Sequence, residues 1–160
     1  MTDLATTAPA FVEMAHQIVW CTVATVGVDE RPRTRVLHPI WEWDGSTLTG
    51  WIATSPLSPK AADLAHQPAV SLTYWAPSHD TATAECDTEW ETSPEARRTG
   101  WDRFAQGPPP VGYDPSIIPP WTSPDVEAFG ILRLQPTLLR VQPAAVLLLG
   151  QADQVLTWRA

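Results

Sequence analysis

Arg35 and Lys60 are the two residues whose types and surroundings best suit phosphate binding. Lys60 is the single lysine of the chain, and it follows Ser58-Pro59, a pair that favours the start of a helix. The first N–H groups of a helix lack partners within the helix, so its N-terminus attracts anions. The Ser55 and Ser58 hydroxyls can donate hydrogen bonds there, and the planar guanidinium of Arg35 matches phosphate oxygens. Together these residues predict a site for a phosphate monoester.

A simpler interpretation of the same residues stays open. Ser-Pro is a common helix opening, an arginine on a strand is usually solvated, and a lone lysine can reflect codon usage. The phosphate site therefore depends on whether the fold brings the two cations together.

A hairpin is expected to bring Arg35 to the loop before the helix. Asp44-Gly45 is a strong hairpin signal, because both residues tolerate a positive φ. Alternating residues predict strands over 33–43 and 46–54 on either side. A turn centred between positions 44 and 45 places Arg35 opposite Thr54, where the second strand ends.

The other elements indicate a small, mainly β protein. The chain has 160 residues, which suits one domain over 1–160, and its 17 prolines argue against a helical bundle. Further strands are predicted over 18–27, 69–75, 81–91, 128–141 and 144–158, and short helices over 11–17, 59–67 and 94–105. Residues 1–10 are expected to be a loose leader and 107–124 a proline-rich loop. We predict a six- to seven-stranded antiparallel barrel, closed or nearly closed.

Charge and hydropathy exclude several classes of function. The net charge is −8 and the pI is about 4.8, the opposite of the charge that nucleic-acid binding needs. The longest apolar run, 144–149, is too short to span a membrane, and no signal peptide precedes the first helix. We therefore expect a soluble cytoplasmic protein that binds neither nucleic acid nor membrane. Cys21 and Cys86 form no CxxC motif and are predicted to be buried thiols.

Histidines and carboxylates give weaker signals. The four histidines have no metal-ligand spacing, so no metal site is predicted. His38 is a candidate proton donor or axial haem ligand, although a hydrogen-bonded strand residue is the commoner role. The alternating acids of 85–91 are expected to form a solvated strand edge rather than an acid–base pair. No P-loop, GxGxxG or Gly-x-Ser-x-Gly motif is present.

The ordered set of motifs resembles the FMN-binding split β-barrel of the pyridoxamine 5'-phosphate oxidase-like superfamily. The resemblance covers about residues 11–77 and rests on three segments: TRVLHPIWE (34–42), WIATSPLSPK (51–60) and LAHQPAVSLTYW (64–75). Beyond them, the acidic strand, the helix with Trp101, the loop at 112–115 and a Trp-Arg tail resemble the small stress-protein-like branch.

The resemblance implies an obligate homodimer with FMN in two symmetric clefts between the subunits. Arg35 and Lys60 would hold the FMN phosphate, with Ser58 assisting. The other implied contacts are the backbone around Val36 and Leu37 at the pyrimidine edge of the ring, Thr54 and Ser55 at the ribityl chain or ring, and Trp158 of the second subunit on the far side.

The implied activity is that of an FMN-binding oxidoreductase that acts on a small organic substrate, with the redox chemistry supplied by the flavin. No catalytic side chain is identified. The alternatives are a deazaflavin-dependent reductase, a non-catalytic flavin or haem binding and sequestering module, and an empty barrel that serves as a dimeric interaction domain.

The sequence also departs from the family pattern. It ends in Thr157-Trp158-Arg159-Ala160 rather than in a basic Arg-Leu motif, so oxidation of pyridoxine 5'-phosphate is not predicted. Ser55 replaces a common asparagine and Pro59 a frequent basic residue, which predicts a weaker hold on phosphate.

Overall fold

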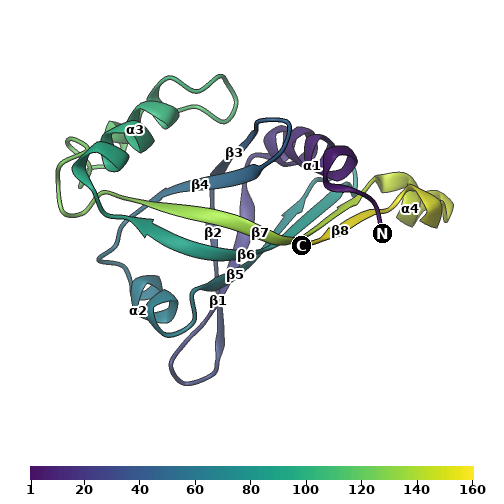
Figure 1. Cartoon of the computed structure of the whole chain (residues 1–160), viewed down its shortest axis with the longest axis horizontal. Coiled ribbons are helices and arrows are strands. Elements are labelled where there is room, and N and C mark those ends of the chain that lie inside the picture. The colour runs from purple at the N-terminus through teal and green to yellow at the C-terminus, as the bar shows by residue number, and fades with distance from the viewer.

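The barrel wall is one antiparallel sheet of eight strands, in the order β2-β1-β5-β6-β7-β4-β3, with β8 paired to β7 (Figure 1). The computed structural model describes residues 1–160. The strands are β1 (Cys21–Val26), β2 (Pro32–Leu37), β3 (Pro39–Trp43), β4 (Leu48–Thr54), β5 (Ala69–Trp75), β6 (Thr81–Glu91), β7 (Gly130–Gln142) and β8 (Leu156–Arg159). The two edge strands, β2 and β3, are separated only by His38. The sheet thus curls into a split barrel whose edges meet in sequence, which confirms the predicted fold class.

The predicted strand over 33–43 is wrong, because the chain changes its pairing partner in the middle. Arg35 on β2 lies opposite Val23 of β1, whereas β3 pairs with β4. Arg35 therefore does not lie opposite Thr54. Pro39 opens β3 and has no N–H to donate, so a continuous ladder across position 38 is disfavoured.

The predicted hairpin forms, but its centre lies one residue later than expected. Trp43 pairs with Leu48, and the Asp44 carboxylate accepts the N–H groups of Ser46 and Thr47, both at 2.8 Å. Gly45 has a φ of 97°, a conformation that glycine adopts without strain.

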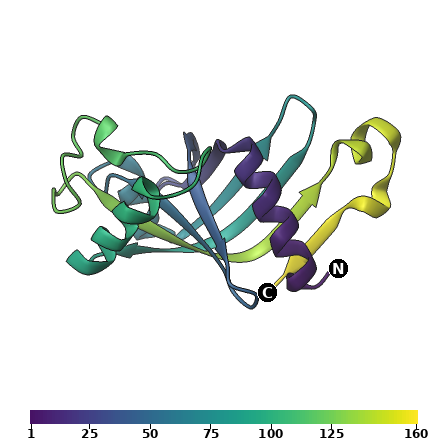
Figure 2. The ribbon, with the colours of Figure 1, turned by 90° about the horizontal axis from the view of Figure 1, so that it is seen from above.

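Residues 1–10 are not a loose leader, because α1 (Leu4–Ile18) begins there. The Asp3 carboxylate accepts the Thr6 N–H at 2.7 Å and caps the helix. Ala8 is fully buried, so the small residues that obscured the helical pattern are those that allow close packing on the barrel. The N–H of Thr2 also donates to the carbonyl of Thr157, which places the two ends of the chain side by side (Figure 2).

The main core fills the barrel and is closed by α1. Phe11 of α1 packs edge-on against Trp41 and Tyr74, and the indole N–H of Trp41 donates to the Tyr74 hydroxyl at 2.8 Å. Both cysteines are free and buried, as predicted, and burial raises the pKa of Cys21 to about 12. No helix of the chain is long and apolar enough to cross a membrane.

A second core lies outside the barrel, under α3 (Pro94–Ala105) and the proline-rich loop. Phe104 of α3 and Phe129 are fully buried there, together with Trp121 of the loop and Ile131 of β7. The loop at 107–124 contains one short 3-10 turn, η1 (Pro115–Ile117), and otherwise runs irregularly, as predicted. Both views show α3 and this loop at one end of the molecule (Figures 1 and 2).

The predicted strand over 144–158 is mostly wrong. The segment contains α4 (Ala144–Leu149), a 3-10 turn η2 (Ala152–Gln154) and only then β8. The Ala144 N–H donates to the Asp80 carboxylate at 2.8 Å, and Gly150 ends the helix with a φ of 69°. The helix α4 projects from the end opposite α3 (Figure 2), whereas β8 returns to the sheet and pairs with β7.

Candidate functional site

Lys60 lies in the first turn of α2 (Pro59–His66), where its ammonium group has no carboxylate partner. Ser58 occupies the N-cap position, but its hydroxyl does not cap the helix. Instead that hydroxyl donates to the carbonyl of Ser55 and accepts from the Lys60 Nζ, both at 2.6 Å. Burial, and secondarily the positive charge of Arg35, lower the pKa of Lys60. The cation is therefore partly desolvated, with no negative charge to compensate it.

Arg35 is held against β1 by three polar groups. Its guanidinium donates to the carbonyl of Val23 at 3.1 Å and to the Thr25 hydroxyl at 2.8 Å, and lies 3.6 Å from the Asp63 carboxylate. Burial lowers the pKa of Arg35, while the nearby Asp63 opposes this shift. The Arg35 side chain is thus fixed in place at a partly buried position.

Asp63 is the residue that sequence reasoning missed. The residue is only 6% exposed and, with Leu64, forms the buried part of α2. It accepts from the Thr25 hydroxyl at 2.7 Å and pairs with Arg33 at 3.5 Å. Helical spacing gives no signal for its burial, because Asp63 does not share a face with Ala61 and Ala65, and Ala65 is itself exposed. A buried carboxylate needs a cation, and the sequence has arginines nearby at 33 and 35.

Arg35 is connected to α2 through Asp63 rather than through the predicted hairpin. The helix α2 packs on β1, the strand that also pairs with β2. Asp63 then links the helix that carries Lys60 to the strand that carries Arg35. No hydrogen bond joins the two cations, and the positive charge of Arg35 is the lesser of the two causes that lower the pKa of Lys60.

The remaining predicted site residues are distributed around this region. Val36 is 62% exposed on the outer face of the sheet, whereas Leu37 is half-buried against the barrel core. Thr54 is buried at the end of β4, and the Ser55 hydroxyl accepts the N–H of Leu57 at 3.2 Å.

Trp158 occupies a different part of the same chain. It packs against the barrel core and, with Leu4 and Leu48, lines a cavity of about 430 Å³. Neither Arg35 nor Lys60 lines that cavity. A contact between Trp158 and the flavin of a second subunit stays a prediction.

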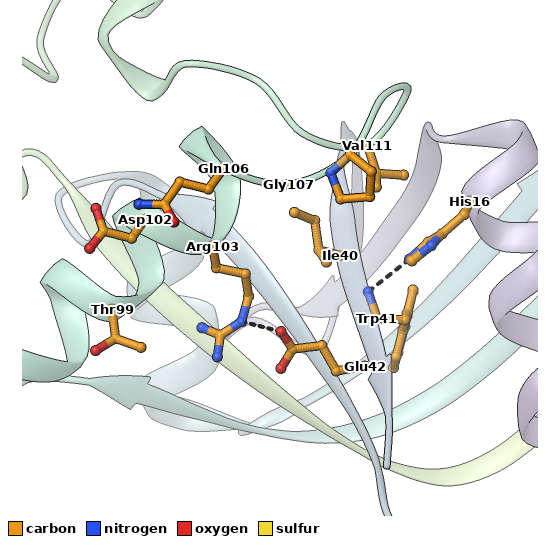
Figure 3. Close-up of a pocket in the computed structure, with 11 residues that line it drawn as sticks. His16, Ile40, Trp41, Glu42, Thr99, Asp102, Arg103, Gln106, Gly107 and Val111 are labelled. Atoms are coloured by element: carbon orange, nitrogen blue, oxygen red, sulfur yellow. Dashed lines mark hydrogen bonds and ion pairs between the residues drawn. The ribbon is translucent and has the colours of Figure 1, made fainter. Parts of the chain in front are cut away.

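A cavity of about 450 Å³ lies between α1, β3 and α3, away from the two cations (Figure 3). On one side, the His16 Nε2 accepts the Trp41 N–H at 3.0 Å, and on the other, Arg103 pairs with Glu42 at 2.7 Å. Arg35 and Lys60 line none of the five main cavities.

His38 is a packing residue of the seam between β2 and β3. Its ring stacks on Tyr113 with centroids 5.2 Å apart and approaches Trp20 at 5.1 Å. Burial lowers the pKa of His38, and its Nε2 is enclosed without a hydrogen-bond partner. A role of His38 as an axial haem ligand or proton donor stays a prediction.

The acids of β6 lie on its outward side. Glu85 and Asp87 are exposed, and Glu89 and Glu91 pair with Arg133 of β7. The carboxylates thus lie on one face of the strand, but the expected strand edge is wrong, because β6 pairs with β5 on one side and with β7 on the other.

No family model and no curated protein matches the sequence. Solved structures do match its fold. A protein related to general stress protein 26, of the pyridoxinephosphate oxidase family from Clostridium acetobutylicum, has a TM-score of 0.67 at 12% identity, covering 97% of this chain and 93% of that one. A pyridoxamine 5'-phosphate oxidase-related, FMN-binding protein from Nostoc punctiforme has a TM-score of 0.66 at 17% identity, covering 100% and 97%. A haem-binding protein from Mycobacterium smegmatis has a TM-score of 0.62 at 16% identity, covering 99% of this chain and 59% of that one. This chain therefore has the split-barrel fold of the pyridoxamine 5'-phosphate oxidase-like proteins.

Proposed function

We propose that the chain binds FMN through the phosphate, at the start of α2, and that Arg35, Lys60 and Ser58 hold it. The observation that carries this proposal is the uncompensated charge of Lys60. A partly buried ammonium group without a carboxylate, next to a guanidinium, is unfavourable unless an anion joins it. A phosphate group supplies that charge together with acceptors for several donors.

The donors around α2 fit a phosphate monoester. A guanidinium has five N–H donors, and the contacts of Arg35 with Val23, Thr25 and Asp63 engage only its two terminal nitrogens. The Lys60 ammonium has three donors, of which Ser58 accepts one. Donors therefore remain on both cations, beside the helix N-terminus.

We place the flavin ring along the outer face of the barrel, beside the backbone of Val36 and Leu37. Thr54 and Ser55 are assigned to the ribityl chain or the ring. In the proposed homodimer a second copy encloses the ring, and Trp158 of the second subunit lies on its far side. The exposed indole of Trp75 on the same outer wall supports burial of this wall in a dimer.

The proposed activity is that of an FMN-dependent oxidoreductase acting on a small organic substrate. Bound FMN would supply hydride or electron transfer, while the chain binds and orients it. Deazaflavin binding, haem binding and storage of a flavin without turnover are the competing outcomes. FMN is favoured over haem because His38 is enclosed.

The first test is the visible spectrum of the purified protein, followed by mass spectrometry of the released small molecule. A flavin spectrum and the mass of FMN are expected. A Soret band, the mass of a deazaflavin, or a dimer that takes up no flavin would overturn the FMN assignment. Oxidation of NAD(P)H with a small acceptor then separates an enzyme from a storage protein.

The second test isolates the phosphate contacts. FMN and riboflavin differ only in the phosphate, so the ratio of their dissociation constants measures what these contacts contribute. We expect the apoprotein to bind FMN at least about tenfold more tightly than riboflavin, the effect of one charge-assisted contact. Equal affinities would contradict the site at α2.

A further inference from the structure

Asp63 places a buried carboxylate where three elements meet. From α2, it accepts a hydrogen bond from Thr25 of β1 at 2.7 Å, and it lies 3.6 Å from the guanidinium of Arg35 on β2. Arg33 of β2 lies 3.5 Å from its other oxygen. The only other hydrogen bond or ion pair between α2 and the β1–β2 hairpin is the exposed pair His66 and Glu30. Asp63 is therefore the buried link between the helix and the two strands.

The Thr25 hydroxyl connects Asp63 to Arg35 through two hydrogen bonds of fixed direction. It accepts from the Arg35 guanidinium at 2.8 Å and donates its single proton to Asp63 at 2.7 Å. The carboxylate thus fixes the hydroxyl, and the hydroxyl fixes one terminal nitrogen of Arg35. A third contact, from Arg35 to the carbonyl of Val23, holds the other terminal nitrogen.

We infer that Asp63 is a positioning residue for the phosphate site. Asp63 and Lys60 lie one turn apart on α2, so the carboxylate that orients Arg35 belongs to the same rigid helix as the second cation. The two cations then reach an anion as a preorganised pair, without loss of side-chain freedom on binding. This inference rests on the proposed FMN function.

A carboxylate also repels a nearby phosphate, and this repulsion lowers FMN affinity, whereas the positioning of Arg35 raises it. The charge of Asp63 is already paired with Arg33 and Arg35, so its field at a neighbouring anion is largely cancelled. Positioning is therefore expected to exceed repulsion. Removal of the charge should weaken FMN binding, whereas a purely repulsive role predicts tighter binding.

The test compares Asp63→Asn with Asp29→Asn, because Asp29 is an exposed partner of Arg33 at 2.9 Å and does not contact Arg35. FMN and riboflavin are titrated against each apoprotein by fluorescence quenching. Asp63→Asn should lower the preference for FMN over riboflavin about tenfold and leave riboflavin affinity unchanged. Asp29→Asn should keep the wild-type ratio. An unchanged or increased FMN preference in Asp63→Asn would overturn the inference.

The Arg35→Ala background separates positioning from other effects. Asp63→Asn should cause no further loss of FMN affinity there, because Asp63 acts through Arg35. A further loss, or an equal loss of FMN and riboflavin in the single variant, would assign Asp63 to structure alone.

Two variants of Thr25 keep the inference testable if Asp63→Asn does not fold. Thr25→Val removes the bridging hydroxyl and should lower the FMN preference, whereas Thr25→Ser keeps the hydroxyl and should restore it. Equal ratios for these two variants would contradict the inference. A wild-type protein without FMN preference would overturn the phosphate site itself, and the role of Asp63 with it. A wild-type preference that survives in the variants would overturn only the role of Asp63.

Discussion

The helices α2 and α3 begin with the same Ser-Pro pair, yet the two serines make different contacts. Ser93 caps α3, because its hydroxyl accepts the N–H of Ala96 at 3.1 Å. Ser58 stands at the equivalent position of α2, where its hydroxyl contacts the Lys60 ammonium and the carbonyl of Ser55. The Ser93 hydroxyl thus caps its own helix, whereas the Ser58 hydroxyl accepts a hydrogen bond from an ammonium group.

The regions around the two helices differ in the same way. Under α3, Arg97 also lacks a carboxylate partner, but one of its terminal nitrogens donates to the carbonyls of Val126 and Phe129, while its Nε is buried without a partner. Around α2, Lys60 has no carboxylate partner, and burial disfavours its charged form. Backbone carbonyls of the same chain thus hold the cation of α3, whereas the cation of α2 contacts a single hydroxyl and keeps donors for the proposed phosphate.

The largest expected effect lies in the α3 region. Phe104→Ala removes a fully buried ring from the core under α3 and should lower the free energy of unfolding by about 3–5 kcal/mol. Urea unfolding measures this loss. The ratio of FMN to riboflavin affinity in the folded protein should not change, and a changed ratio would show that the two regions are not independent.

Arg35→Ala should give the largest effect on binding. Loss of one charge-assisted phosphate contact should weaken FMN affinity by about 1.5–3 kcal/mol, with little effect on riboflavin. Arg97→Ala is the matched control, because it leaves the carbonyls of Val126 and Phe129 without this donor. It should lower stability but keep the FMN preference. Similar FMN retention in the two variants would contradict the assignment of the phosphate site to α2 rather than α3.

Alkaline pH should weaken phosphate binding in the α2 region. The pKa of Lys60 lies below its ordinary value of 10.5, so FMN affinity should fall in the alkaline range, where this amine loses its proton. Riboflavin affinity should stay constant there. A FMN preference that does not change with alkaline pH would remove Lys60 from the site.

Near α1 and β3, His16 should make stability fall at acid pH. Burial lowers the pKa of His16 below its ordinary value of 6.5, and its Nε2 accepts the N–H of Trp41 only in the unprotonated form. The unfolded chain then binds the proton more readily, so this contribution to stability is present above pH 6.5 and is lost as the pH falls through the folded-state pKa. Urea unfolding between neutral and acid pH measures it, and His16→Gln should reduce the slope.

The smallest effects should come from the two serines. Ser93→Ala removes a helix cap and should cost about 1 kcal/mol of stability without changing FMN preference. Ser58→Ala removes no cap, so its stability should change less, while its FMN preference should fall modestly. The reverse pattern would show that Ser58 serves the helix after all.

Much of the fold follows from local sequence patterns. The alternation in 69–75 and 81–91 predicts β5 and β6 with their observed bounds, and Ser93-Pro94 predicts the start of α3. Local patterns fail where packing decides the outcome. The small residues of 1–10 form a helix because the barrel gives them a surface to pack on, and the apolar run 144–149 forms α4 outside the sheet.

The candidate site shows the same division between local and long-range information. The sequence by itself determined the residue types that suit a phosphate, the start of α2 and the antiparallel barrel, because charge, capping and two-residue alternation act over a few positions. Only the tertiary structure decided that Arg35 pairs with β1 rather than β4, and that Asp63 and Thr25 orient it. Strand partners and buried ion pairs depend on residues far apart in the chain, so they become visible only once the sheet has closed and excluded water from its wall.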